Sequence, residues 1–120
     1  SHMSVWQEKL PHSETWLVGV EGRLDQALNT KLEETLNDLL DNGHYHLVVD
    51  LTQATYINSG GLRCLVGAWR RAKANEGTLA LCGLNSRLQE IFTMVGFDKV
   101  FEIHENCATA RARGRAKNSS

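Results

Sequence analysis

The chain has 120 residues, of which 42% are hydrophobic and 22% are charged, and its formal net charge is −1. This length predicts one domain with a single core and is too short for two domains of ordinary size. No apolar run approaches the roughly 20 residues needed to cross a bilayer, so we expect no membrane insertion and a cytoplasmic protein.

The charges are unevenly distributed along the chain. All 14 acidic residues precede position 110, whereas four of the 13 basic residues follow it: Arg111, Arg113, Arg115 and Lys117. The body therefore carries nine basic against 14 acidic residues, which disfavours nucleic acid as its partner. We expect residues 111–120 to be a basic, disordered tail because they show no apolar periodicity. Residues 1–3, Ser-His-Met, are typical of a remnant of a cleaved purification tag, so the predicted domain covers residues 4–110.

The first half of the chain predicts a strand, a helix and a second strand. The run "TWLVGV" at 15–20 is short, apolar and partly β-branched, as in a strand. Between residues 28 and 40, leucines recur at spacings of three and four, which predicts an amphipathic helix ending near Gly43. The continuous apolar run "HLVVDL" at 46–51 predicts a strand that is buried on both faces.

The second half continues the alternation. An apolar stripe predicts a helix that ends near Gly77, its members being Leu62, Leu65, Val66 and Trp69. A strand follows at 78–84, then a helix with Ser86 and Gln89 as a capping box, and a last strand at 100–104. This order predicts an α/β fold: a mixed or mostly parallel sheet of about four to five strands with about three to four helices.

The stretch "NSGGLR" at 58–63 joins a buried strand to a helix. Asn58 and Ser59 are both good helix N-caps, and Gly60 and Gly61 allow a tight turn. The start of a helix also favours negative charge, because its backbone N–H groups are unpaired and its dipole is positive there, so a phosphate on Ser59 would be accommodated. One side of the helix, away from the apolar stripe, carries Ser59, Arg63, Gly67 and Arg70. Such a face suits contact with another protein, with a merely solvated face as the alternative.

Neither the cysteines nor the histidines predict an active centre. Cys64, Cys82 and Cys107 are odd in number and widely spaced, so we expect reduced thiols with no disulfide and no metal. The histidines of the body show no spacing of a catalytic motif. We therefore expect a protein that is not an enzyme and that needs no cofactor.

The segment 48–101 resembles the STAS domain of bacterial anti-sigma factor antagonists. In that family an apolar strand is followed by an Asp-Ser-Ser-Gly-Leu-type turn, a helix, a glycine turn, another strand and a further helix. Upstream, "VEGRLD" at 20–25 is similar to the family's Gly-x-Leu-Asp element. The likeness spans about residues 15–104, so the resemblance identifies 4–110 as a STAS-like domain.

The resemblance implies a partner switch without catalysis by this chain. The family's phosphorylated serine falls on Ser59. Unmodified, the domain would bind an anti-sigma factor that has an ATP-binding serine-kinase domain, and phosphorylation would release that partner until a serine phosphatase reverses it. The partner-binding residues would be Asn58, Ser59, Gly60, Gly61, Arg63 and Arg70, with a second contact loop at Arg23 and Asp25. For Asp25, helix capping is the alternative role.

Two residues depart from the family pattern. Asn58 stands where an aspartate is usual, and Gly60 stands where a second serine or threonine is usual. The loss of the carboxylate removes a charge that could assist phosphoryl transfer. Both departures would suit an alternative function, a non-phosphorylated STAS accessory subunit of a transporter or a ligand-sensing module.

Overall fold

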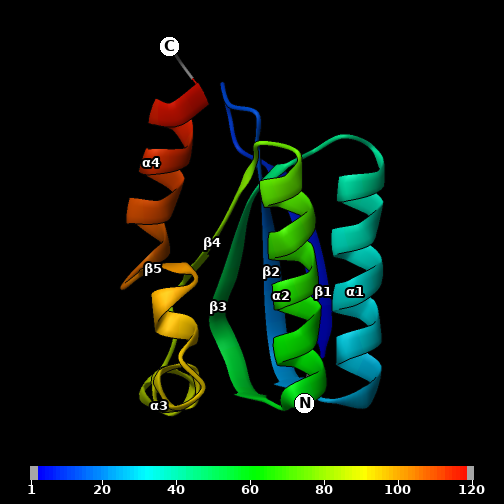
Figure 1. Cartoon of the computed structure of the whole chain (residues 1–120), viewed down its shortest axis with the longest axis vertical. Helices are drawn as coiled ribbons and strands as arrows, with labels where there is room; N and C mark the ends of the chain where they lie inside the picture. The colour runs from blue at the N-terminus through cyan, green and yellow to red at the C-terminus, as the bar shows by residue number, and fades with distance from the viewer. Residues whose placement is uncertain (1–2, 119–120) are drawn as a thin grey trace.

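A computed structural model describes residues 3–118 of the chain, the last six of them by their backbone alone. One five-stranded sheet is flanked by helices (Figure 1). The strands are β1 (Ser4–Lys9), β2 (Thr15–Leu24), β3 (His46–Ile57), β4 (Thr78–Cys82) and β5 (Glu102–His104). The helices are α1 (Gln26–Asp41), α2 (Ser59–Ala74), α3 (Ser86–Met94) and α4 (Cys107–Asn118), with a 3₁₀ turn η1 (Phe97–Lys99).

The strands lie in chain order, and β1 is antiparallel to β2 while the other three neighbouring pairs are parallel. The predicted α/β fold with a mixed sheet is therefore confirmed. Parallel neighbours place the carboxyl ends of β2, β3 and β4 at one edge of the sheet, where α1, α2 and α3 begin. The candidate site lies at this edge.

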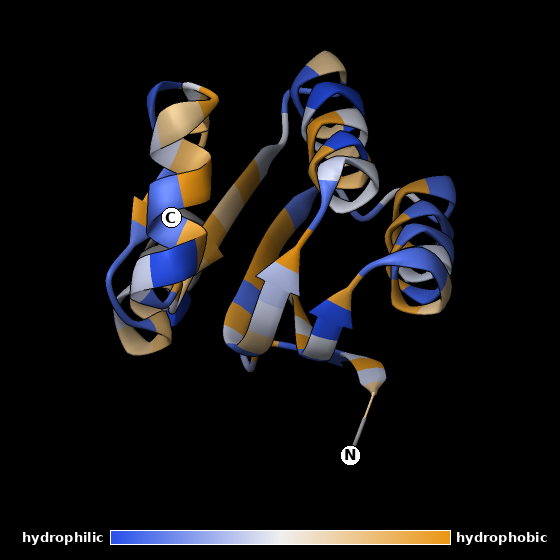
Figure 2. Cartoon of the chain, turned by 90° about the horizontal axis from the view of Figure 1, so that it is seen from below, coloured by the Kyte–Doolittle hydropathy of each residue, from blue (hydrophilic) through white to orange (hydrophobic). Residues whose placement is uncertain are grey.

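The sheet has two buried faces of unequal size. Along β3, Leu47 and Val49 join a large cluster under α1, α2 and α3, whereas Val48 joins a small cluster on the opposite face. This alternation confirms that "HLVVDL" is a strand buried on both sides. Figure 2 shows α1 and α2 side by side on the larger face, and α4 packs on the other.

The first strand, β1, was not among the predicted elements. It pairs with β2 in an antiparallel hairpin in which Trp6 lies opposite Gly19. The indole of Trp6 fills the space that a side chain at Gly19 would occupy. After the strand, the Leu10 side chain is fully buried. Pairing with β2 and the burial of Leu10 stabilise β1 on the sheet. Both depend on contacts with other segments, so the local sequence did not indicate this strand.

The expectation of reduced thiols is wrong for two of the three cysteines. Cys82 at the end of β4 and Cys107 at the start of α4 form a disulfide, and Cys64 remains free. The two bonded cysteines are 25 residues apart. They meet because β5 pairs beside β4 and returns the chain to the end of that strand. The spacing of the two cysteines in the sequence does not indicate that they lie close together.

The C-terminal segment also differs from the expectation. Helix α4 continues through residues 111–118, where a disordered tail was predicted, and residues 119–120 lie outside the described part. Ala110 is buried on the sheet, and the Arg111 guanidinium lies 2.9 Å from the Glu8 carboxylate. Of the predicted tag remnant, residues 1–2 also lie outside the described part. None of the helices described is long and apolar enough to cross a membrane.

Candidate functional site

The start of α2 is held by Asn58. Its backbone N–H donates to the Leu24 carbonyl of β2, with 3.0 Å between N and O, which ties the ends of the two strands together. Its side-chain Oδ1 accepts the Gly61 backbone N–H at 3.1 Å. Asn58 is therefore the N-cap, and the competing interpretation of Ser59 as the cap is wrong. Ser59 is the first residue of the helix, and its side chain is exposed.

Close packing requires a glycine at position 61. Neither Gly60 nor Gly61 has a positive φ; the described glycines that do are Gly22, Gly43, Gly83 and Gly96. A Cβ on the buried Gly61 would lie 2.7 Å from Cγ1 of Ile57 and 2.9 Å from Oδ1 of Asn29. The Asn29 side-chain amide in turn lies 2.8 Å from Oδ1 of Asn58. A side chain at Gly61 would therefore collide with Ile57 of β3 and Asn29 of α1.

An open hollow of about 420 Å³ lies beside Ser59 on the outer side of α2. Its lining combines apolar and basic side chains: Ser59, Leu62, Arg63, Val66, Gly67, Arg70 and Phe97. The predicted helix side with Ser59, Arg63 and Arg70 is therefore one continuous surface. Within residues 3–112, neither arginine forms an ion pair. The hollow offers an apolar floor flanked by two uncompensated positive charges.

Arg23 and Asp25 lie at the same edge of the sheet but in a different hollow. The Arg23 guanidinium stacks 4.3 Å from the centre of the Tyr56 ring, and its Nε lies 3.4 Å from the Asp25 carboxylate. Asp25 occupies the N-cap position of α1, but its side chain makes no capping hydrogen bond. The expected capping role is therefore limited to its backbone, whose carbonyl accepts the Leu28 N–H.

A family model, the STAS domain, matches residues 9–110 of the chain. The chain belongs to the STAS domain family. A relative of this STAS domain is the anti-sigma-B factor antagonist of Listeria monocytogenes, 32% identical over 84 residues, which are 70% of this chain and 74% of that protein. The match confirms the predicted family, places the chain among anti-sigma factor antagonists and supports the prediction of a non-enzymatic regulator.

Solved structures share the fold of this STAS domain. An anti-sigma factor antagonist from Mycobacterium paratuberculosis superposes with a TM-score of 0.83 at 19% identity, over 95% of each chain. The Bacillus cell fate determinant SpoIIAA in its phosphorylated form superposes with a TM-score of 0.74 at 16% identity, over 92% of this chain and 98% of that one.

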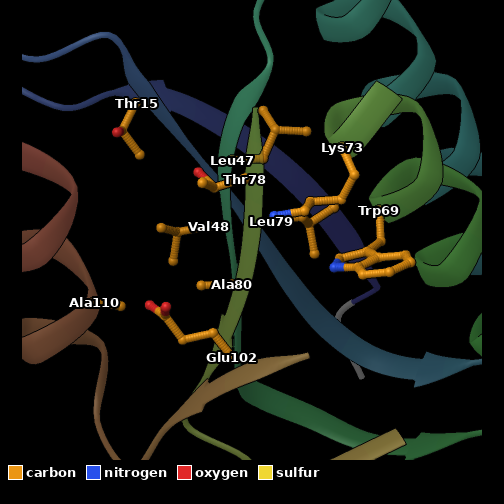
Figure 3. A pocket seen from close by; sticks show the side chains of 10 residues that line it. All are labelled: Thr15, Leu47, Val48, Trp69, Lys73, Thr78, Leu79, Ala80, Glu102 and Ala110. Carbon is orange, nitrogen blue, oxygen red and sulfur yellow. The ribbon is translucent and has the colours of Figure 1, made fainter. Parts of the chain in front are cut away.

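A further hollow of the STAS domain lies at the opposite edge of the sheet. Figure 3 shows its lining side chains on both sides of β4, among them Trp69, Lys73, Thr78 and Glu102. Its volume is about 90 Å³. Pockets for drug-sized ligands and cofactors measure about 300–1,000 Å³. This cavity is therefore too small for a ligand of that size.

Two side-chain groups outside the predicted site bring titratable atoms together. The His104 ring Nε2 lies 2.6 Å from the Glu102 carboxylate. Residues two positions apart lie on the same face of any strand, so this spacing alone did not indicate a site. Asp50 offers a carboxylate oxygen within 4.8 Å of the sulfurs of Cys82 and Cys107. Those sulfurs are bonded to each other and provide no thiolate, so this group does not form a metal site in the oxidised protein.

Proposed function

We propose that this STAS domain is an anti-sigma factor antagonist that works by partner switching in the cytoplasm. Unphosphorylated, it binds an anti-sigma factor with an ATP-binding serine-kinase domain. Phosphorylation of Ser59 releases that partner, and a serine phosphatase restores binding. The observation that carries the proposal is the exposed Ser59 side chain at the start of α2, beside an apolar hollow flanked by Arg63 and Arg70.

The chemistry of phosphorylation fits this position. Ser59 Oγ attacks the γ-phosphorus of ATP, a new O–P bond forms, the bond to the β-phosphate breaks, and ADP leaves while a base of the kinase takes the hydroxyl proton. The phosphate then lies at a helix N-terminus, where the dipole favours negative charge. Arg63 lies one helical turn further on and can pair with it.

The same charges explain why the phosphate would release the partner. Arg63 and Arg70 are available for acidic groups of a partner, and the apolar floor of the hollow is available for one of its hydrophobic side chains. A phosphate adds about −1.5 to −2 charges, occupies Arg63 and repels those acidic groups. A difference of about 3 kcal/mol between the two forms would change the affinity more than a hundredfold.

Asn58 is compatible with the switch although it lacks a carboxylate. Its Oδ1 already accepts a hydrogen bond from the Gly61 backbone N–H, so the amide caps the helix as an aspartate would. It does so without a negative charge beside the future phosphate. We infer that the departure from the family pattern preserves the geometry of the helix start and removes a repulsive charge.

The phosphorylation step is tested by mixing the protein with kinase-type anti-sigma factors and ATP and locating the phosphate by mass spectrometry. We expect one phosphate on Ser59, none on the Ser59→Ala variant, and unchanged labelling of the Ser86→Ala variant. Ser86 is a matched control because it is also the exposed first residue of a helix. A protein that binds the anti-sigma factor and is never phosphorylated would refute the switch.

The docking surface is tested through Gly67. A Cβ at Gly67 meets no atom within 4 Å, so a large side chain there would fill the hollow without disturbing the core. We expect Gly67→Trp to weaken binding to the anti-sigma factor by at least about tenfold, one anchoring contact being worth about 1.4 kcal/mol or more. Ala74→Trp, at the exposed far end of the same helix, should bind normally. Equal binding of both variants would exclude the hollow from the interface.

A further inference from the structure

The second face of the sheet is covered by α4 (Figure 1). Within residues 107–112, this helix contributes little apolar surface. The cluster beneath it consists of Leu10, Leu17, Val48, Ala80, Cys82 and Ala110. Ala110 is the only member of this buried cluster that α4 supplies within residues 107–112, and Cys107 packs against it half-buried. On the other face, α1 alone supplies five buried leucines. Within residues 107–112, side-chain packing therefore holds α4 weakly.

Within residues 107–112, the other contacts of α4 with the rest of the chain are one ion pair, a 3.6 Å contact between the Thr52 hydroxyl and Cys107 Sγ, and the disulfide. Arg111 and Glu8 form the ion pair, and their side chains are 34% and 51% exposed. Ion pairs at such exposure contribute little to stability because water and salt screen them. Among these described contacts, the bond between Cys82 and Cys107 is the strongest link between α4 and the sheet.

We propose that Cys82 and Cys107 are a reversible thiol–disulfide site that a peroxide closes and a low-molecular-weight thiol opens, and that the closed state holds α4 on the sheet. The Cα atoms of the two residues lie 5.0 Å apart, a distance at which the bond forms without movement of the backbone. Permanent disulfides are uncommon in the reducing cytoplasm, where we propose that the chain works, and those found there are often transient or redox-sensing.

The burial of the two cysteines indicates the order of the chemical steps. Cys107 is half-buried at the start of α4, whereas Cys82 is fully buried, so a peroxide reaches Cys107 first. The Cys107 thiolate attacks one peroxide oxygen; an S–O bond forms, the O–O bond breaks, and water leaves after protonation. The Cys82 thiolate then attacks the Cys107 sulfur; the S–S bond forms, the S–O bond breaks, and the hydroxide takes a proton and leaves as the second water.

The proton and electron balance of this reaction is complete. Two thiols lose two protons and two electrons, and one hydrogen peroxide becomes two waters. The Asp50 carboxylate lies within 4.8 Å of both sulfurs and can accept the Cys82 proton, directly or through one water. In the reverse direction two molecules of glutathione reduce the bond and leave as glutathione disulfide.

The bond itself is tested in the full chain carrying Cys64→Ala, which removes the free thiol. When the reduced protein is treated with hydrogen peroxide, we expect its mass to fall by two hydrogens and a maleimide to add to neither cysteine. After excess glutathione, we expect maleimide to add to both. Oxidation that stops at sulfinic acid on Cys107, without a cross-link to Cys82, would overturn the proposal.

The hold on α4 is tested by amide hydrogen exchange of the same protein in both states. We expect the α4 amides to exchange at least about tenfold faster after reduction, while α2 amides keep their protection. Cys107→Ser should show the fast rate under both conditions. Glu8→Gln, which removes the ion pair, should keep the slow rate when oxidised. Equal protection of α4 in the reduced and oxidised proteins would refute a redox-controlled hold.

Discussion

Two helices of this domain begin with the same dipeptide, Asn-Ser, at the same edge of the sheet. At α2, Oδ1 of Asn58 accepts the backbone N–H three residues later at 3.1 Å, and at α3, Oδ1 of Asn85 does so at 2.9 Å. Ser59 and Ser86 are each the exposed first residue of their helix. Their backbones therefore offer the same environment to an anion.

The side chains around the two serines differ. One turn after Ser59 lies Arg63, whereas one turn after Ser86 lies Glu90. A phosphate would be attracted at the first position and repelled at the second. Capping thus explains the asparagine in both helices, and the neighbouring charge distinguishes the proposed switch from an ordinary helix start.

The largest expected loss of stability comes from changing a residue whose backbone N–H is bound by one of the two asparagine caps. Leu88, which receives the Asn85 cap, is fully buried in the main core. Leu88→Ala should lower the free energy of unfolding by about 2–5 kcal/mol, because it removes buried methyl groups and leaves a cavity. Urea denaturation measures this loss. A loss below about 1 kcal/mol would show that α3 is not held by its core face.

In α2 the residue whose N–H is bound by the cap is Gly61. A larger side chain at this position is expected to destabilise the domain by overpacking. Gly61→Val should destabilise the domain by about 1–3 kcal/mol because its side chain would collide with Ile57 and Asn29. Gly67→Ala is the control, since it has open space and should be neutral or stabilising by up to about 1 kcal/mol. In thermal melts, the melting temperature should therefore fall for Gly61→Val and stay unchanged or rise for Gly67→Ala.

The caps themselves should contribute similar, smaller amounts. Asn58→Ala and Asn85→Ala should each cost about 1 kcal/mol, because each leaves a helix N–H without its side-chain acceptor. Asn58→Asp should keep nearly full stability, since a carboxylate caps equally well. Chemical denaturation of the three variants checks this expectation, and a large loss for Asn58→Asp would show that the start of α2 does not tolerate a carboxylate at this position.

The effect that is smallest near neutral pH is a pH dependence that arises from Cys64 on α2. Burial raises the pKa of the Cys64 thiol to about 12, and the Glu33 carboxylate adds to the rise. In the unfolded chain a thiol ionises near pH 8.5. The folded state therefore binds the extra proton above that pH, and stability should fall as the pH rises from about 8.5 toward 12. The decline should be shallower in Cys64→Ala, and an identical decline would assign it to other groups.

Much of the architecture was predictable because its signals are local. The leucine spacing of α1 and the apolar run of β3 determine their own secondary structure and burial. The position of Ser59 at a helix start followed from the same reasoning. The choice of Asn58 as the cap did not, since both residues are good caps and only the Gly61 and Asn29 contacts decide between them.

The unpredicted features depend on contacts between distant segments. The Cys82–Cys107 bond forms because β5 pairs beside β4, which no spacing rule reveals. Helix α4 lacks an apolar stripe, so its sequence resembles a solvated tail although its first turns pack on the sheet. Neither element could be assigned before the sheet order was known.

The central claim is tested most directly by the affinity of a kinase-type anti-sigma factor for three forms of the protein, measured by calorimetry. These are the unmodified chain, the chain phosphorylated on Ser59, and the Ser86→Asp variant. The account predicts that Ser59 phosphorylation weakens binding at least about a hundredfold, whereas Ser86→Asp changes it by less than about threefold. Equal affinity of the phosphorylated and unmodified chains would contradict it.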